Sequence, residues 1–212
     1  IPILPRTLNG KYPVKYDLDC DGNGEYEYTG LTMNATCKYS PNTGKHQISV
    51  RGNISAITLC DDDSDSVEAV ISVDDWGDIR WKSMSYFAHK CKNLIELPQN
   101  APNLSEVTDM SYMFNDASSF NQSIEHWDVS HVTNMSGLFD GASSFNRPLE
   151  KWNVSNVTDM SRMFIGAKSF NQPLEKWNVS HVTNMSKMFS AAVSFNQPIE
   201  RWNVSNVTNM SY

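Results

Sequence analysis

The sequence has little charge and no long apolar run. Charged residues make up 19% of the 212 residues. No apolar run approaches the roughly 20 residues that a membrane-spanning helix needs. The net charge of −7 indicates an acidic surface. Because nucleic acids and anionic membranes bind basic patches, this charge argues against both as partners.

The motifs of common enzymes are also missing. The sequence contains no G-x-S-x-G, no H-E-x-x-H and no phosphate-binding glycine loop. Two of the five histidines, His131 and His181, occupy one position of an internal repeat, where Asn156 and Asn206 stand in other copies. A catalytic or metal-binding residue is not usually exchanged for asparagine in alternate repeats. We therefore interpret these histidines as surface residues and expect no enzyme activity.

The chain has only four cysteines, Cys20, Cys37, Cys60 and Cys91, and none is spaced as a C-x-x-C metal ligand. An even number of cysteines outside the regular repeats predicts two disulfides and an oxidising compartment, with free buried thiols as the alternative. The first two cysteines flank a stretch of hairpin size, and the last two bracket a junction between regions. We predict the pairs Cys20–Cys37 and Cys60–Cys91.

A 25-residue repeat dominates the second half of the chain. Residues 152–176 are followed by a copy, residues 177–201, that is identical at 17 of 25 positions. Further copies begin at Trp127 and Trp202, and a degenerate copy begins at Pro102. Self-similarity at this period predicts stacked units whose stability comes largely from the interfaces between neighbouring repeats.

The apolar spacing within a repeat predicts a strand, a short helix and a turn. Leu174, Trp177 and Val179 are spaced as one buried face of a short strand. The next apolar residues recur at steps of three and four, as on one face of a helix: Val182, Met185, Met188, Phe189 and Ala192. The prolines near the end of each unit predict a turn. The repeated tryptophans are predicted to be buried, rather than to form an exposed row for carbohydrate: Trp127, Trp152, Trp177 and Trp202.

Charged residues recur as well. Glu150 and Glu175 stand beside Lys151 and Lys176, and equivalent pairs occur at 125–126 and 200–201. Stacking would place a glutamate row beside a basic row, where opposite charges offset the repulsion between like charges. We interpret the rows as a solvated, compensated face; a charged binding strip is the alternative.

The repeat resembles that of a known family. The string M-F-x-G-A-x-S-F-N-Q-P-L-E-x-W-N-V-S-x-V-T-x-M-S is similar to the 25–26-residue repeat of BspA-like bacterial surface proteins, over residues 102–212. The resemblance implies a secreted or surface-anchored, leucine-rich-repeat-like protein that adheres to host proteins or to other cells. The sequence contains no signal peptide and no anchor and ends at Tyr212 within a repeat, so we expect a processed product or a fragment.

An acidic stretch near the N-terminus suggests a calcium loop. Oxygen-bearing side chains alternate along it, with Gly22 at the sixth position: Asp17, Asp19, Asp21, Asn23 and Glu25. The twelfth position, where an EF-hand carries glutamate, is Tyr28. We predict a weak structural Ca²⁺ site and no other cofactor; a solvated acidic turn is the alternative.

The surrounding region resembles a PKD-type β-sandwich. The similarity rests on the stretches 16–22, 37–39 and 44–50. It implies a β-sandwich in which Cys20 and Cys37 lie near adjacent strands. The alternative is a small β-cap that serves only the repeats.

The predicted fold is α+β. A small N-terminal β-sandwich, residues 1–75, precedes a right-handed leucine-rich-repeat-like β/α solenoid, residues 76–212. Residues 76–101 form an atypical cap, because a terminal repeat must cover an open end of the core. Full repeats start at residues 102, 127, 152, 177 and 202.

The expected function is adhesion at the cell surface or in the extracellular space, through binding of a host or other-cell protein or glycan. The alternative is a structural spacer or surface-layer component that displays another domain, and self-association is a further option. The family resemblance favours adhesion. The near identity of the repeats favours the spacer, because specific recognition usually needs varied exposed residues.

Overall fold

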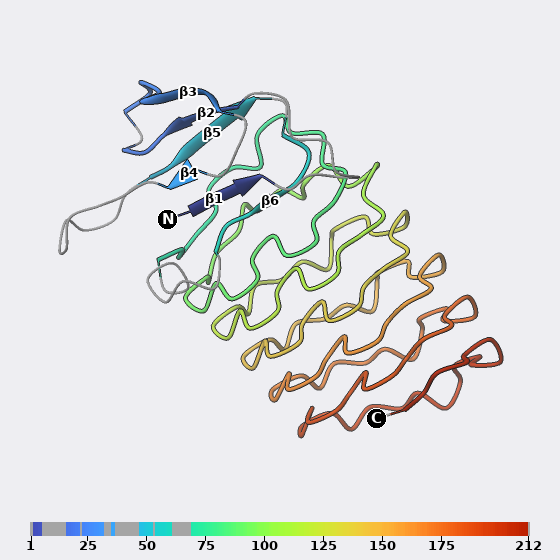
Figure 1. Ribbon diagram of the computed structural model, residues 1–212. Helices are drawn as coiled ribbons and strands as arrows, with labels where there is room; N and C mark the ends of the chain where they lie inside the picture. The colour runs from blue at the N-terminus through green and yellow to red at the C-terminus, as the bar shows by residue number, and fades with distance from the viewer. Residues whose placement is uncertain are drawn as a thin grey trace.

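The chain forms two small sheets followed by a stack of coils (Figure 1). This computed structural model describes residues 2–5, 16–21, 23–31, 35–36, 47–52, 54–60 and 69–211. The strands are β1 (Pro2–Pro5), β2 (Tyr16–Asp19), β3 (Tyr28–Leu31), β4 (Ala35–Thr36), β5 (Ser49–Gly52) and β6 (Ile57–Thr58). They form two antiparallel sheets, with the orders β4-β1-β6 and β3-β2-β5.

The predicted N-terminal β-sandwich is wrong. The described part of residues 1–75 contains only these two three-stranded sheets, whose strands are two to four residues long. Strands this short do not give the two broad inner faces that a sandwich packs together. Each sheet still contributes a side chain to the core, Leu18 from β2 and Ile57 from β6.

The repeats stack with one coil per 25 residues. Single parallel bridges connect equivalent residues along the stack: Asp109, Asn134, Asp159, Asn184 and Asn209. Backbone N–H groups of one coil donate to carbonyl groups of the next, as from Met160 to Asn184 (2.9 Å). Every repeat therefore relies on its neighbour for backbone hydrogen bonds as well as for packing.

The predicted β/α repeat is wrong, because the described residues contain no helix and residues 69–211 contain no strand beyond isolated bridges. In the segment expected to be helical, alternate N–H groups leave the coil. The Met185 and Lys187 N–H groups donate to the next coil, whereas the Met188 N–H group closes a tight turn on the Met185 carbonyl (3.2 Å). An α-helix needs consecutive bonds between residues four apart, so this alternation excludes one. Inward steps of three and four residues arise here from successive tight turns.

The expected strand around Trp177 is replaced by a turn too. The Trp177 N–H group donates to the Leu174 carbonyl (3.0 Å), which closes a tight turn where extended chain was predicted. The bridge to neighbouring coils occurs later, at Asn184. The apolar residues still point inward, so the spacing predicted burial correctly and backbone conformation incorrectly.

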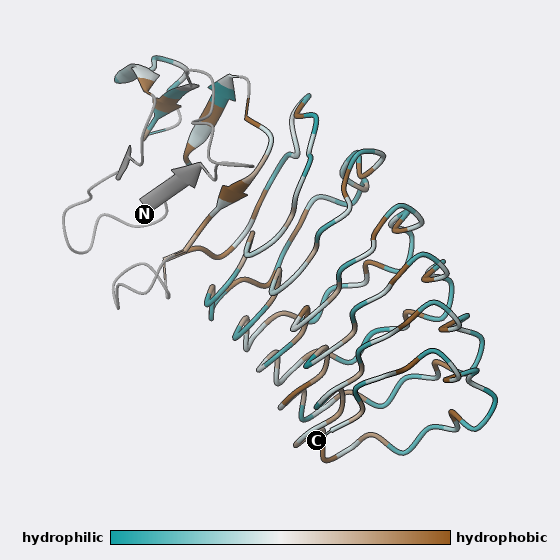
Figure 2. Cartoon of the chain, turned by 45° about the vertical axis from the view of Figure 1, so that its right-hand side comes forward, coloured by the Kyte–Doolittle hydropathy of each residue, from teal (hydrophilic) through white to brown (hydrophobic). Residues whose placement is uncertain are grey.

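Stacked phenylalanines fill the core. One column runs through Phe114, Phe139, Phe164 and Phe189, with ring centroids 5.5–5.7 Å apart. A second runs through Phe120, Phe145, Phe170 and Phe195, at 5.9–6.0 Å. Hydrophobic residues recur at matching places in successive coils (Figure 2). A single buried cluster extends from Leu18 to Trp202, so the sheets and the coils share one core.

The coil before residue 102 is held by both regions. Its Tyr86 N–H group donates to the Ser111 carbonyl (2.9 Å), as the Tyr112 N–H group does one coil later to that of Ser136. On its other side, the Leu59 N–H group donates to the Phe87 carbonyl (2.9 Å). Residues 54–60 therefore cover the first face of the stack.

Candidate functional site

The acidic loop, residues 19–27, is the first candidate site. The carboxylate oxygens of Asp19, Asp21 and Glu27 lie within 4.8 Å of one another. Asp19 is fully buried and accepts hydrogen bonds from the N–H groups of Asp21 (3.1 Å) and Gly24 (2.9 Å). Such a set of hard oxygen donors fits calcium. The calcium site stays a prediction.

The structure brings together only part of the predicted calcium set. Asp17 lies outside the group and accepts from the Gly30 N–H group (2.8 Å) and from Arg51 Nε (2.9 Å). These hydrogen bonds, the Gly30 bond first, lower the pKa of the Asp17 carboxyl. Glu25 is also absent from the three-carboxylate group, where Glu27 stands instead.

A shift of register explains the difference. If Asp19 is the first position of the loop, Asn23 is the fifth and Gly24 the sixth, where calcium loops require glycine for a sharp turn. Gly24 has a φ of 89°, a conformation that favours glycine. The Asn23 side chain lies beside Asp21, to whose Oδ2 its Nδ2 donates (3.1 Å). The second glycine of the stretch was the signal that could have given this register.

The repeated tryptophans are buried, as predicted. The side chains of Trp152 and Trp177 are 3% and 4% exposed. Their indole Nε1 groups donate to carbonyl groups of the preceding coil, from Trp152 to Ile124 (3.0 Å) and from Trp177 to Leu149 (2.9 Å). Buried rings cannot stack on a sugar, so these residues hold neighbouring coils together.

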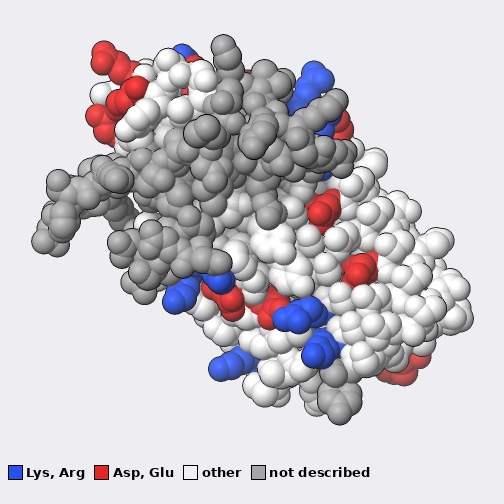
Figure 3. Space-filling model, viewed as in Figure 1, with Lys and Arg blue, Asp and Glu red and all other residues white. Residues whose placement is uncertain are grey.

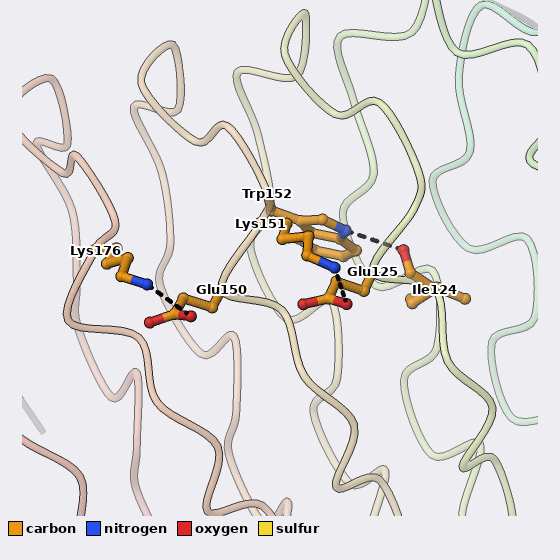
Figure 4. A network of polar contacts seen from close by, with 6 residues as sticks. All are labelled: Ile124, Glu125, Glu150, Lys151, Trp152 and Lys176. Carbon is orange, nitrogen blue, oxygen red and sulfur yellow. Dashed lines mark hydrogen bonds and ion pairs between the residues drawn. The ribbon is translucent and has the colours of Figure 1, made fainter.

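The charged rows pair across coils, as Figure 4 shows. Lys151 Nζ lies 3.1 Å from Glu125 Oε2, and Lys176 Nζ lies 3.1 Å from Glu150 Oε2. On the face shown in Figure 3, most of the coil surface is uncharged, and cations lie next to carboxylates in places. This pairing matches the interpretation of a compensated face.

The exchange of His181 for asparagine in the next repeat has a structural reason. His181 Nδ1 lies 2.7 Å from the Ser155 carbonyl oxygen, and Asn206 Nδ2 donates to the Ser180 carbonyl (2.7 Å). Nδ1 of histidine and Nδ2 of asparagine are both attached to Cγ, so either side chain can make the same bond between coils. A carbonyl only accepts, so His181 carries its proton on Nδ1.

A surface that was not predicted from the sequence lies on the turns of the coils. In repeat 152–176 it consists of Arg162, Ile165, Gly166 and Lys168. We call these four repeat positions, with their counterparts in the other coils, the variable edge. The same positions hold Tyr, Asn, Asp and Ser in the repeat that begins at residue 102. The signal in the sequence was this variation inside an otherwise regular repeat.

An ion pair connects two coils at this edge. Arg162 Nη2 lies 3.1 Å from Oδ2 of Asp140, whose side chain is largely buried. Burial raises the pKa of the Asp140 carboxyl, and repulsion from Asp116 adds to the rise, whereas Arg162 opposes it. Nearby, the rings of Tyr86 and Tyr112 stack with centroids 5.2 Å apart. Burial likewise raises the pKa of the Tyr112 hydroxyl.

Of the two predicted disulfides, the pair Cys60–Cys91 is confirmed. Cys60 and Cys91 form a disulfide that ties the segment after β6 to the first coil. Cys20 is disulfide-bonded, but Cys37 lies outside the described residues. The pair Cys20–Cys37 stays a prediction that peptide mapping under non-reducing conditions would test.

The repeats identify the family. A family model described as "Mycoplasma protein of unknown function, DUF285" matches residues 81–190 and 149–212, so that residues 81–212 are covered. The chain belongs to this DUF285 family. The match covers most of the coil before residue 102 and all of the repeats after it, so the matched region consists of the coils. Comparison with curated proteins finds no match, and neither does comparison with solved structures.

Membership of the DUF285 family identifies a repeat protein without stating its function. The BspA-like and PKD-like resemblances are not confirmed by this match. The Cys60–Cys91 disulfide is consistent with an extracellular protein. Within the described residues of this DUF285 chain, no helix is long and apolar enough to span a membrane.

Proposed function

We propose that the chain is a non-enzymatic adhesion module at the cell surface, which binds a protein or glycan of a host or of another cell. One observation carries the proposal: the coils are nearly identical inside, yet they differ at the exposed positions of the variable edge. Stacking alone requires no such variation. Varied exposed side chains on a regular scaffold are what recognition by a repeat protein needs.

The stack suits this role physically. Backbone hydrogen bonds, buried tryptophans and two phenylalanine columns hold each coil to the next. A partner would therefore meet a surface that is already ordered, and ordering costs little on binding. The disulfide between Cys60 and Cys91 supports a place outside the cell.

A spacer that displays another domain is the second candidate. The compensated charges of the glutamate and lysine rows and the strict repetition of the buried positions favour it. Both functions predict a stable stack, so binding decides between them.

The test is a binding screen with the full chain. We expect saturable binding to at least one member of a panel of host matrix proteins and glycans, measured by biolayer interferometry. A chain unfolded by reduction and heat is the control for non-specific adsorption. Failure across both panels would replace adhesion by the spacer.

A further inference from the structure

All non-glycine residues with positive φ in the described part of the chain lie on two columns of the variable edge. Their φ angles are 54–61°. They are Tyr86, Lys90, Tyr112, Asp116, Arg162, Lys187 and Ala191. Glycine fills the remaining places of the two columns, at Gly137, Gly141 and Gly166. Each coil therefore has two left-handed positions, and the chain itself shows that the fold accepts glycine at both.

Side chains at these positions weaken the fold. A left-handed conformation is unfavourable for any residue with a Cβ atom, and glycine adopts it without strain. Stability alone would select glycine throughout. Two of the glycines are required by their neighbours, because a Cβ at Gly137 would overlap the Tyr112 ring and one at Gly141 would overlap the Asp116 carboxylate. Arg162 pairs with Asp140 and the two tyrosines stack, so these side chains also serve the fold, whereas the exposed side chain of Lys187 is kept despite strain, which points to a use outside the fold.

The chemistry of the edge differs from that of the whole chain. It carries the cations Lys90, Lys92, Arg162, Lys168 and Lys187, against two carboxylates, Asp116 and Asp140. The whole chain has a net charge of −7. Arg162 and Lys187 are exposed, and Tyr86 and Tyr112 are half-buried. Tyrosine and arginine are the residues that most often dominate the binding energy of protein interfaces.

The packing of the tyrosines distinguishes between classes of partner. The Tyr86 and Tyr112 rings stack at an interplanar angle of 21°, and Gly137 lies so close to the Tyr112 ring that a Cβ there would overlap it. Tyr86 therefore covers one face of the Tyr112 ring, and Gly137 crowds the ring further against stacking by a sugar. Ring edges and a hydroxyl group remain, and these suit hydrogen bonds and side-chain packing with a polypeptide.

We propose that the variable edge binds an acidic polypeptide segment that lies along the stack, an inference that rests on the proposed adhesion function. The cations of the two coils that begin at residues 152 and 177 attract the carboxylates of the segment, and the tyrosine pair supplies contact area at the N-terminal end of the edge. Half of the eight differences between residues 152–176 and 177–201 fall at this edge, so its side chains contribute most to which segment binds.

The test uses the full chain and poly-L-glutamate as the acidic probe, with hyaluronan as an anionic glycan of similar length. Lys187→Gly places at this position the residue that Gly137 already provides. Lys168→Ser likewise copies Ser143. The matched control is Arg147→Gln, which removes one positive charge away from the edge and copies Gln172. Gln172 Nε2 contacts the Asn146 carbonyl as Arg147 Nε contacts that of Asn121, so the control keeps its bond between coils.

We expect the wild type to bind poly-L-glutamate in a salt-dependent way, K187G to bind it more weakly, and the double variant K168S/K187G to bind roughly tenfold more weakly, the change that corresponds to 1.4 kcal/mol. The R147Q variant should bind like the wild type. K187G should melt at the same or a higher temperature, because glycine relieves the left-handed strain. Ala191→Gly should also melt no lower and leave binding unchanged.

Three results would overturn the proposal. R147Q could weaken binding as much as K187G, which would indicate general electrostatic attraction. The wild type could bind hyaluronan and not poly-L-glutamate, which would assign the edge to a glycan. The edge variants could retain full binding to a matrix protein found in the screen. In that case the adhesion function stands, and the variable edge is not its binding surface. A wild type that binds no member of the screen refutes adhesion itself.

Discussion

Replacing Trp152 with alanine tests whether the coils depend on one another. The side chain is 3% exposed, and truncating a buried tryptophan costs about 3–5 kcal/mol. Its Nε1 bond to the Ile124 carbonyl adds about 1 kcal/mol. The carbonyl is not left without a partner, because it also accepts from the Trp127 N–H group (3.1 Å). We expect a total loss of about 4–6 kcal/mol in the free energy of unfolding.

Two variants separate the contributions. Trp152→Phe retains most of the buried ring and loses the indole donor, so it should cost only about 1–2 kcal/mol. Trp202 is 9% exposed, more than Trp152, so Trp202→Ala should cost less than Trp152→Ala.

Urea unfolding followed by circular dichroism and by tryptophan fluorescence measures all three variants. In a linear array, damage in the middle divides the stack, so W152A should unfold in two steps with the coils after residue 152 unfolding first. A single transition within about 1 kcal/mol of the wild type would refute the idea that buried tryptophans couple the coils.

Three further predictions concern His181, the acidic loop and Asp140. His181→Asn should leave the melting temperature unchanged, because asparagine makes the same bond between coils, whereas His181→Ala should lower it slightly; equal melting of both variants would contradict this role. Millimolar calcium should raise the melting temperature of the N-terminal region by linkage, compared with chelator, and an Asp19→Asn variant should lose the effect; an unchanged wild-type melt would remove the site. The raised pKa of the Asp140 carboxyl means that its contribution to stability is fully present below its ordinary value of 3.8 and is lost as pH rises through the raised value. The stability of the wild type relative to Asp140→Asn should therefore fall as pH rises above about 4, and parallel pH profiles of the two proteins would contradict the shift.

The repeat period and the buried residues were predictable from the sequence. Trp152, Trp177 and the phenylalanines recur at fixed places, and apolar residues that recur in this way lie in a shared core. Steps of three and four residues place side chains on one side of a helix, and they do the same in a series of tight turns. The spacing therefore predicts which residues are buried in either conformation.

The backbone conformation was not predictable by the same route. A spacing such as Met185, Met188 and Phe189 fits a helix until the N–H groups are assigned to partners. Those partners lie in the next coil, and left-handed residues such as Lys187 end any helical turn. Nothing in a local pattern reports bonds to a segment 25 residues away. Similarly, the short strands near Leu18 were too irregular to distinguish two small sheets from a sandwich.

The candidate sites, too, were only partly predictable from the sequence. The acidic loop was found from its composition, but its register was shifted by two residues because either glycine fits the sixth position. The variable edge was visible as differences between copies, yet its strain could be seen only from backbone angles, as at Arg162 and Tyr112.

The bonds between coils join equivalent places, which bears on how the gene can change length. Glu125 pairs with Lys151 and Glu150 with Lys176, so each coil presents the same contacts to whichever coil follows. Recombination that adds or removes a whole 25-residue unit keeps every such contact, whereas loss of one residue displaces all of them. Stacked chains lie about 4.8 Å apart, so each exchanged unit alters the reach of the molecule by one small, fixed step. Each exchange also inserts or deletes one set of variable-edge residues, which couples the length of the molecule to its binding surface.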